Sequence, residues 1–206
     1  MKPTLLRRAV AEFTGTLFLL AAVIGSGIMG EKLSAGNVAI ALLANTIAPG
    51  AALVAIILAF GSVSGAHLNP AVTLADAWQG GIAWRETPAY IAAQITGAVA
   101  GVIAAHLMFG LPILSASTHI RTGSAQLLSE FVATFGLFAA IWGCGRYRPT
   151  AVPFAVGAYI TAAYWFTAST SFANPAVTLA RSMSNTFSGI RPADAPGFIA
   201  AQLAGA

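Results

Sequence analysis

Charged side chains are scarce in this chain. They make up 8% of its 206 residues, and only six of them are acidic. A soluble domain of ordinary composition carries about 25% charged residues. Because 57% of the residues are hydrophobic and the mean hydropathy is +0.79, the chain has too few polar groups to form an ordinary water-exposed surface. The composition therefore predicts a protein that is surrounded mostly by lipid.

Cysteine is almost absent as well. The single Cys144 excludes an intrachain disulfide and a metal site built from several thiolates. We interpret Cys144 as a small apolar side chain near a helix end.

The net charge of +4 does not indicate a nucleic-acid partner, because the basic residues form no stripe or cluster. No pairing of a nucleophile with a base is recognisable, so we predict neither an enzyme nor a metal site.

Long apolar runs are what the sequence does contain. Five are long enough to cross the hydrocarbon core of a bilayer, which is roughly 30 Å thick: 9–29, 36–60, 87–109, 125–143 and 150–168. The first run is too long for the hydrophobic part of a signal peptide, so we interpret it as a retained helix. A sixth run begins near Ala195 and reaches Ala206. About 12 residues rise only about 18 Å as a helix, so we expect this helix to continue beyond the sequence.

The runs belong to an internal repeat. AEFTGTLFLL around Glu12 matches SEFVATFGLF around Glu130, and YIAAQITGA at 90–98 matches FIAAQLAGA at 198–206. Between these pairs the heptapeptide NPAVTLA occurs twice, at 69–75 (the first box) and 174–180 (the second box). Each half contains three runs, an odd number, so the second half must enter the membrane in the opposite orientation. The pattern predicts one channel domain made of two inverted repeats, 1–110 and 111–206, with a site at the bilayer midplane.

The basic residues indicate the orientation of this repeat. If the N-terminus is cytoplasmic, more basic residues fall inside than outside, as the positive-inside rule requires. Those inside are Lys2, Arg7, Arg8, Arg85, Arg146 and Arg148, and those outside are Lys32, Arg121 and Arg191. We therefore expect an integral membrane protein with a cytoplasmic N-terminus.

Each box predicts a short helix. Asn69 and Asn174 are N-cap residues, and Pro70 and Pro175 suit the first helical position. Ten residues rise about 15 Å, so two such half-helices placed end to end span the core. Their positive N-terminal ends then meet at the midplane, where each Asn offers a side-chain donor to permeating molecules. Ala71 and Ala176 complete the two Asn-Pro-Ala triplets.

With these features the whole chain resembles the aquaporin, or major intrinsic protein, family. The resemblance implies a right-handed bundle of six transmembrane helices with two re-entrant half-helices. It also implies a homotetramer with one pore per subunit and no cofactor. In that family two buried glutamates accept hydrogen bonds from the re-entrant loops, a role that falls here to Glu12 and Glu130. Gln94 and its counterpart in the second repeat, Gln202, are expected to support the same loops. His67 occupies a loop position for which we expect a packing or gating role.

The selectivity filter departs from the family pattern. Most members carry an arginine directly after the second box's alanine, where this chain has Val177. The family spacing places the other filter positions at Pro49, Ala162 and Ser171, which predicts a wide and mostly apolar ring. Thr46, on roughly the same helix face as Pro49, is an alternative source of a hydroxyl.

Arg181 lies one turn beyond Val177 and leaves two interpretations open. Its side chain could reach back into the pore, or it could bind the C-terminal end of its own half-helix.

The missing arginine also narrows the resemblance, to bacterial channels associated with arsenic-resistance operons. That implies conduction of water, glycerol-like polyols and metalloid hydroxides such as arsenite, and of small organoarsenicals, with exclusion of protons and ions. A water-selective channel remains an alternative. A proton-coupled transporter that uses Glu12 and Glu130 is a further one.

Overall fold

A computed structural model describes residues 3–206, and these residues form eight α-helices, one 3-10 helix and no strand. The helices are α1 (Leu5–Leu33), α2 (Val38–Ser64), α3 (Pro70–Trp78), α4 (Thr87–Met108), α5 (Ser124–Tyr147), η1 (Pro149–Ala151), α6 (Val152–Phe166), α7 (Pro175–Arg181) and α8 (Ala195–Gly205). The all-α prediction is confirmed. Lys2, one of the charges assigned to the cytoplasmic side, lies outside the described residues.

Four helices are long and apolar enough to cross a membrane: α1, α2, α4 and α5. They correspond to the first four predicted runs and extend most of them by a few residues. The fifth run, 150–168, was predicted too long, because α6 has 15 residues and rises about 22 Å. A 3-10 turn precedes it, and the backbone becomes extended at Thr167, where the chain turns toward the second box. α8 begins at the predicted Ala195 and has 11 residues.

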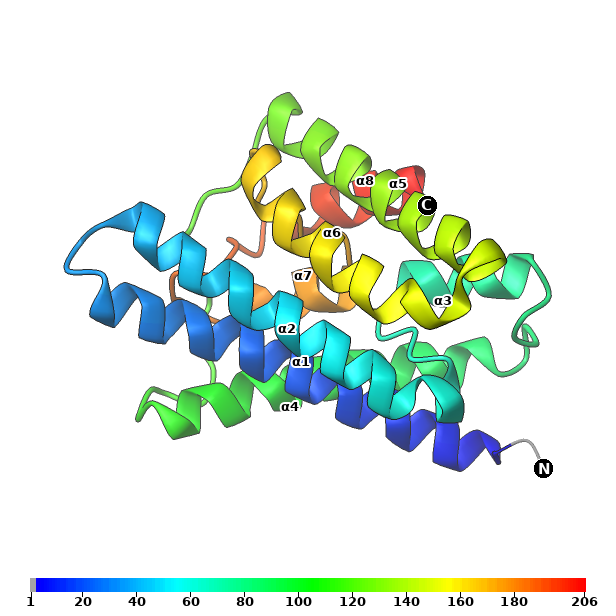
Figure 1. Cartoon of the computed structure of the whole chain (residues 1–206). Helices are drawn as coiled ribbons and strands as arrows, with labels where there is room; N and C mark the ends of the chain where they lie inside the picture. The colour runs from blue at the N-terminus through cyan, green and yellow to red at the C-terminus, as the bar shows by residue number, and fades with distance from the viewer. Residues whose placement is uncertain (1–2) are drawn as a thin grey trace.

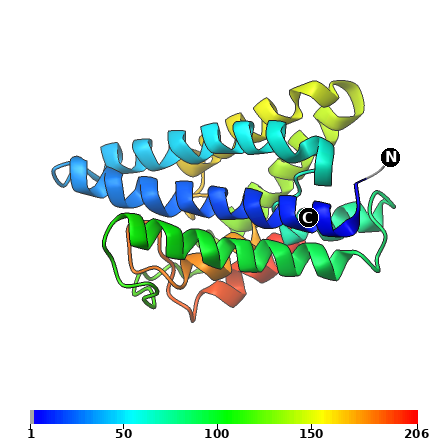
Figure 2. The same ribbon diagram turned by 90° about the horizontal axis from the view of Figure 1, so that it is seen from below.

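The long helices lie side by side, as Figure 1 and Figure 2 show. α1 packs between α2 and α4, whereas α5 packs against α6 and α8, and the contact between α2 and α6 joins the two groups. α3 packs against α4, α7 packs against α4 and α8, and the two short helices touch each other. The two half-helices thus pack against α4 and against each other, and α7 is buried along most of its length.

Glycines allow the closest helix approaches. A Cβ atom at Gly97 would overlap the backbone carbonyl of Phe13, and one at Gly101 would overlap that of Leu17, so α4 touches the backbone of α1. Gly205 of α8 makes the same kind of approach to the carbonyl of Phe131 in α5. Small residues at these points let apolar helices associate by close packing, which is how helices associate in lipid.

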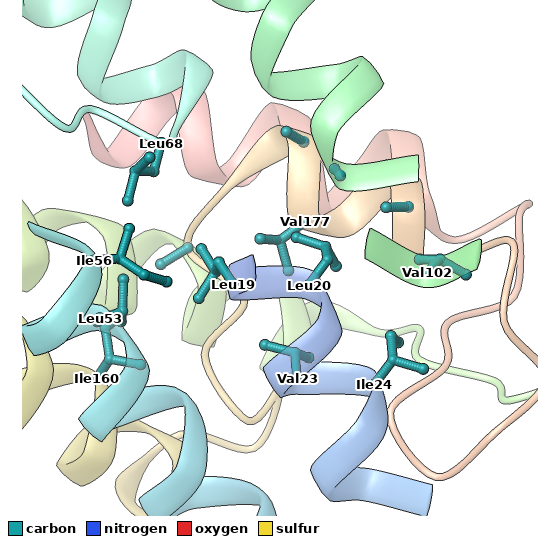
Figure 3. Packing of buried hydrophobic residues seen from close by; sticks show 14 of the residues in the cluster. Leu19, Leu20, Val23, Ile24, Leu53, Ile56, Leu68, Val102, Ile160 and Val177 are labelled. Carbon is teal, nitrogen blue, oxygen red and sulfur yellow. The ribbon is translucent and has the colours of Figure 1, made fainter. Parts of the chain in front are cut away.

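The hydrophobic core is built from residues of α1, α2, α4, α5, α6 and α7. Figure 3 shows Val177 of α7 beside Leu19 and Leu20 of α1, all of them in one buried cluster. Leu68, in the loop before α3, belongs to the same cluster. The chain around both boxes is therefore held by apolar contacts on several sides.

Candidate functional site

The two boxes are joined by a reciprocal pair of hydrogen bonds. Asn69 Nδ2 donates to the carbonyl of Ala173 over 2.8 Å, and Asn174 Nδ2 donates to the carbonyl of Leu68, also over 2.8 Å. Each Asn Oδ1 caps its own helix by accepting from Ala71 N at 2.9 Å or Ala176 N at 3.0 Å. An amide has two N–H donors, so each Asn keeps one donor beyond this clamp.

The loops before the boxes have an unusual backbone. Ala66 and Leu68 before the first box, and Ser171 and Ala173 before the second, have φ values of 48° to 52°. Side-chain-bearing residues rarely adopt this left-handed region, which is strained by about 1–3 kcal/mol per residue. Thr170, with a φ of 61°, adds a further left-handed residue to the second loop. Such a loop needs partners that hold it in place.

A buried carboxylate holds the first loop. Glu12 Oε1 accepts from His67 N at 2.9 Å, and Glu12 Oε2 accepts from Leu68 N at 2.6 Å. Ser64 Oγ and Gln94 Nε2 supply two further donors at 2.6 and 2.8 Å. Both carboxylate oxygens are therefore engaged, as a buried charge requires.

The second loop is held in the same way. Glu130 Oε1 accepts from Phe172 N and Glu130 Oε2 from Ala173 N, each at 2.9 Å. Gln202 Nε2 donates to Glu130 Oε2 at 2.6 Å and approaches Thr178 Oγ1 at 2.8 Å. Gln94 makes the matching contact with Thr73 Oγ1 at 2.8 Å. The structure thus brings both glutamates and both glutamines to the backs of the two loops.

A cavity of about 340 Å³ runs past the fronts of these loops. Its walls are mostly aliphatic and come from α1, α2, α5 and α6 on one side and from the boxes on the other. Among the labelled residues of Figure 3, Leu19, Val23, Leu53, Leu68, Ile160 and Val177 line it. Asn69 and Asn174 both border the cavity, so polar groups interrupt the apolar wall where the boxes meet.

Polar side chains gather at the end of the cavity near the start of α1. His67, Asp76 and Gln79 line it there. His67 Nε2 lies 3.5 Å from Asp76 Oδ2, and its Nδ1 lies 3.2 Å from Thr73 Oγ1. The ring of His67 is also 5.3 Å from that of Tyr90. His67 is therefore held at this mouth by three neighbours.

The opposite end carries an arginine. Arg181 is 1% exposed, lines the cavity and donates from Nε to the carbonyl of Ser188. Its guanidinium carbon lies 3.4 Å from the centroid of the Phe172 ring. Ser171, Tyr164 and Phe172 line the cavity beside it. Of the two interpretations left open by the sequence, the structure places Arg181 in the cavity wall.

A second arginine supports this end from outside. Arg121, in the connection between α4 and α5, donates to the carbonyls of Gly189 at 2.8 Å and Ser169 at 3.2 Å. Its guanidinium carbon is 5.2 Å from the same Phe172 ring. Burial lowers the pKa of Arg121 from its usual value. Arg121 therefore ties the connection before α5 to the loops around the second box.

The predicted ring positions are only partly brought together. Pro49, Ser171 and Val177 line the cavity. Ala162 does not, because it is exposed on the opposite face of α6, and this expectation is corrected. Thr46 is fully buried but is not part of the lining, since its hydroxyl donates to the carbonyl of Leu42 at 2.7 Å.

The sequence reasoning missed several lining residues that a helical period would have found. α6 lines the cavity at every fourth position, with Val152, Val156, Ile160 and Tyr164. Residues four apart share a helix face, so Ala162 falls on the other face and Tyr164 takes its place. On α3, Asp76 shares a face with Val72 in the same way. Phe172 is different, because nothing in its local pattern indicates that it stacks with Arg181.

Comparison with known proteins adds three findings. Residues 1–149 match the model of the family described as Major intrinsic protein. The chain is 60% identical over 202 residues to the aquaglyceroporin AqpS of Rhizobium meliloti (strain 1021), covering 98% of this chain and 86% of that protein. It is 40% identical over 147 residues to aquaporin NIP1-4 of Oryza sativa subsp. japonica, where the match covers 68% of this chain but only 51% of the plant protein.

A solved structure has the same fold. The X-ray structure of the aquaglyceroporin from Plasmodium falciparum matches with a TM-score of 0.74, over 98% of this chain and 92% of that one. At 20% identity this likeness concerns the fold alone. It confirms the predicted arrangement of a helical bundle with two half-helices.

Proposed function

Because the chain belongs to the major intrinsic protein family, we propose that it conducts water, glycerol-like polyols and neutral metalloid hydroxides passively through its cavity. The chain is an integral membrane protein and a channel for small neutral solutes, not an enzyme.

One observation carries the proposal: a mostly aliphatic cavity extends from His67 at one end to Arg181 at the other, past the two Asn side chains. A neutral solute can give up part of its hydration there and regain hydrogen bonds from the free Asn donors. An ion loses far more hydration free energy, because taking a charge out of water costs several kcal/mol even after the protein relaxes. The N-terminal ends of α3 and α7 also carry positive partial charge that disfavours cations.

Val177 supports conduction of solutes larger than water. At the place where most family members have an arginine, this chain has a smaller, uncharged side chain that lines the cavity. Arsenite as the undissociated hydroxide, and small organoarsenicals, then belong to the proposed substrates together with polyols. The 60% identity to a protein named an aquaglyceroporin agrees with the polyol part of this proposal.

The hydrogen bonds of the two buried glutamates argue against a proton-coupled transporter. Glu12 accepts four hydrogen bonds and Glu130 accepts three, and neither residue lines the cavity. A carboxylate that relays protons has to face the pathway and change its charge. We therefore assign both glutamates to holding the loops.

The assembly completes the proposal. We infer two inverted repeats, 1–110 and 111–206, a homotetramer with one pore per subunit, and a bacterial inner membrane with the N-terminus in the cytoplasm. Large apolar side chains on the outer faces, such as Phe18, Leu43 and Phe135, are exposed and suit lipid or a neighbouring subunit.

Stopped-flow light scattering on proteoliposomes tests the proposed function. We expect water, glycerol and arsenous acid each to cross faster than in protein-free vesicles. If water alone is accelerated, the channel is water-selective and the broad-filter proposal is wrong. If glycerol flux changes with an imposed proton gradient, the transporter alternative is favoured instead.

A further inference from the structure

Arg181 is held rigidly at one end of the cavity. It follows Val177 by four residues, so both lie on the same face of α7. Its Nε donates to the carbonyl of Ser188, and its guanidinium group lies over the Phe172 ring. Ser188 is itself fixed, because its hydroxyl donates to the carbonyl of Val23 at 3.0 Å. Tyr164 is a further neighbour of the Arg181 side chain. The guanidinium is thus positioned from several sides.

Two polar atoms in this part of the cavity wall lack a partner. Arg181 Nη1 and Ser171 Oγ are both buried, and neither has a hydrogen-bond partner among residues 3–206. Both residues line the cavity. Burying a polar group without a partner is unfavourable, and nearly all such groups in native proteins find one. Two of them in one wall indicate that a molecule in the cavity supplies the partners.

The charge of Arg181 also lacks a counter-ion. Within the described part of the chain, the ion pairs join Arg8 to Glu86, His67 to Asp76 and Arg191 to Asp194. The nearest candidate, Glu130, is occupied by two backbone amides and Gln202. Arg121 adds a second positive charge on the same aromatic ring. This end of the cavity therefore favours the lone pairs of an oxygen and disfavours cations.

We propose that Arg181 and Ser171 together form a binding site for neutral solutes with a pair of hydroxyl groups. Arg181 Nη1–H donates to one hydroxyl oxygen, and Ser171 Oγ hydrogen-bonds to the other. Val177 and Pro49 provide the apolar wall for the carbon skeleton. Arg181 is then the specificity-determining cation of this channel, one turn away from the position that Val177 occupies. This inference rests on the proposed conduction of neutral solutes.

Two isomers of equal size test the site: 1,2-propanediol, with two hydroxyls, and 2-methoxyethanol, in which a methyl ether replaces one of them. The permeability of each is measured in proteoliposomes of the full chain, after subtraction of the flux through protein-free vesicles. Because the isomers have the same volume, the ratio of their permeabilities reports hydrogen bonding rather than pore width. In Arg181→Leu we expect the diol-to-ether ratio to fall roughly two- to tenfold, the worth of one hydrogen bond.

Three further variants sharpen the test. Ser171→Ala should lower the ratio in the same direction, and Arg181→Lys, which keeps the charge but not the planar group, should lower it less than Arg181→Leu. Arg7→Leu removes an exposed arginine near the start of α1 that does not line the cavity, so its ratio should equal that of the unmodified chain.

The outcomes separate this inference from the proposed function. If the unmodified chain conducts neither isomer faster than empty vesicles, the proposed function fails and the site with it. If it conducts them but Arg181→Leu keeps the ratio, only the site is refuted. Water permeability shows whether Arg181→Leu has folded. If it has not, an unchanged ratio in both Ser171→Ala and Arg181→Lys refutes the site, and a lowered ratio supports it.

Discussion

At the scale of residues, Val177 is the first side chain that we propose to influence which solutes the cavity admits. It is 5% exposed, lies against Leu19 and Leu20 (Figure 3), and borders the cavity without offering a hydrogen bond. Arg181 lines the cavity one turn further along α7. In the proposed filter, Val177 leaves room for larger solutes and Arg181 provides the positive charge.

Val177→Arg should narrow the cavity at this point. A second guanidinium next to Arg181 brings like charges together and fills the space that larger solutes need. We expect glycerol permeability to fall severalfold more than water permeability in the same proteoliposomes. Val177→Ile, which adds volume without charge, is the matched control. Equal reductions for both solutes in Val177→Arg would show that Val177 does not line the filter.

The sequence predicts the residues of the site where local chemistry fixes them. Asn69 and Asn174 are recognisable because an N-cap followed by proline has one structural meaning. Ala162 was misplaced because the family spacing does not determine which face of α6 points toward the cavity. The four-residue period of the lining residues does determine it. Arg181 stayed undecided because its position depends on Ser188 and Phe172, contacts that no local pattern indicates.

At the scale of elements, the loops before the boxes depend on the buried glutamates. Glu12→Gln keeps the size of the side chain but turns one acceptor oxygen into an N–H donor, which then faces another donor. We expect a destabilisation of about 1–3 kcal/mol from the unpaired buried groups. The thermal unfolding midpoint of the purified protein in detergent should fall, and water permeability should fall with it.

Glu31→Gln is the control for this change, since Glu31 is exposed at the end of α1. It should leave the midpoint unchanged. A Glu12→Gln protein as stable as Glu31→Gln would mean that Glu12 does not hold the loop.

The crossing of α1 and α4 depends on glycine. In Gly97→Ala the new Cβ overlaps the carbonyl of Phe13, so the helices must separate. Overpacking of this kind costs about 1–3 kcal/mol, which a lower unfolding midpoint would report. Gly61→Ala in α2 meets nothing within 4 Å and should be neutral or slightly stabilising. Similar midpoints for the two variants would contradict the close approach.

The elements themselves were largely predictable, because long apolar runs in lipid have only the helix to adopt. Four runs became long helices in the expected places, most of them longer than predicted by a few residues. α6 became shorter than its run, because apolar composition does not report the 3-10 turn at Pro149 or the extended backbone at Thr167.

At the scale of the whole molecule, the two halves carry equivalent parts. Glu12, Gln94 and Thr73 in the first half correspond to Glu130, Gln202 and Thr178 in the second, with matching hydrogen bonds. Repetition in the sequence made this correspondence predictable before any contact was known. The division of the chain after residue 110 stays a prediction, since the halves are interlocked through α2, α6 and the boxes.

The reciprocal clamp between the boxes has a consequence for how the protein forms. Its two bonds join residues that are 104 and 106 positions apart in the chain. Contacts between such distant residues close late, because the entropy of the intervening chain must be lost first. We therefore expect the point where the two boxes meet to form only after both halves of the chain have been inserted.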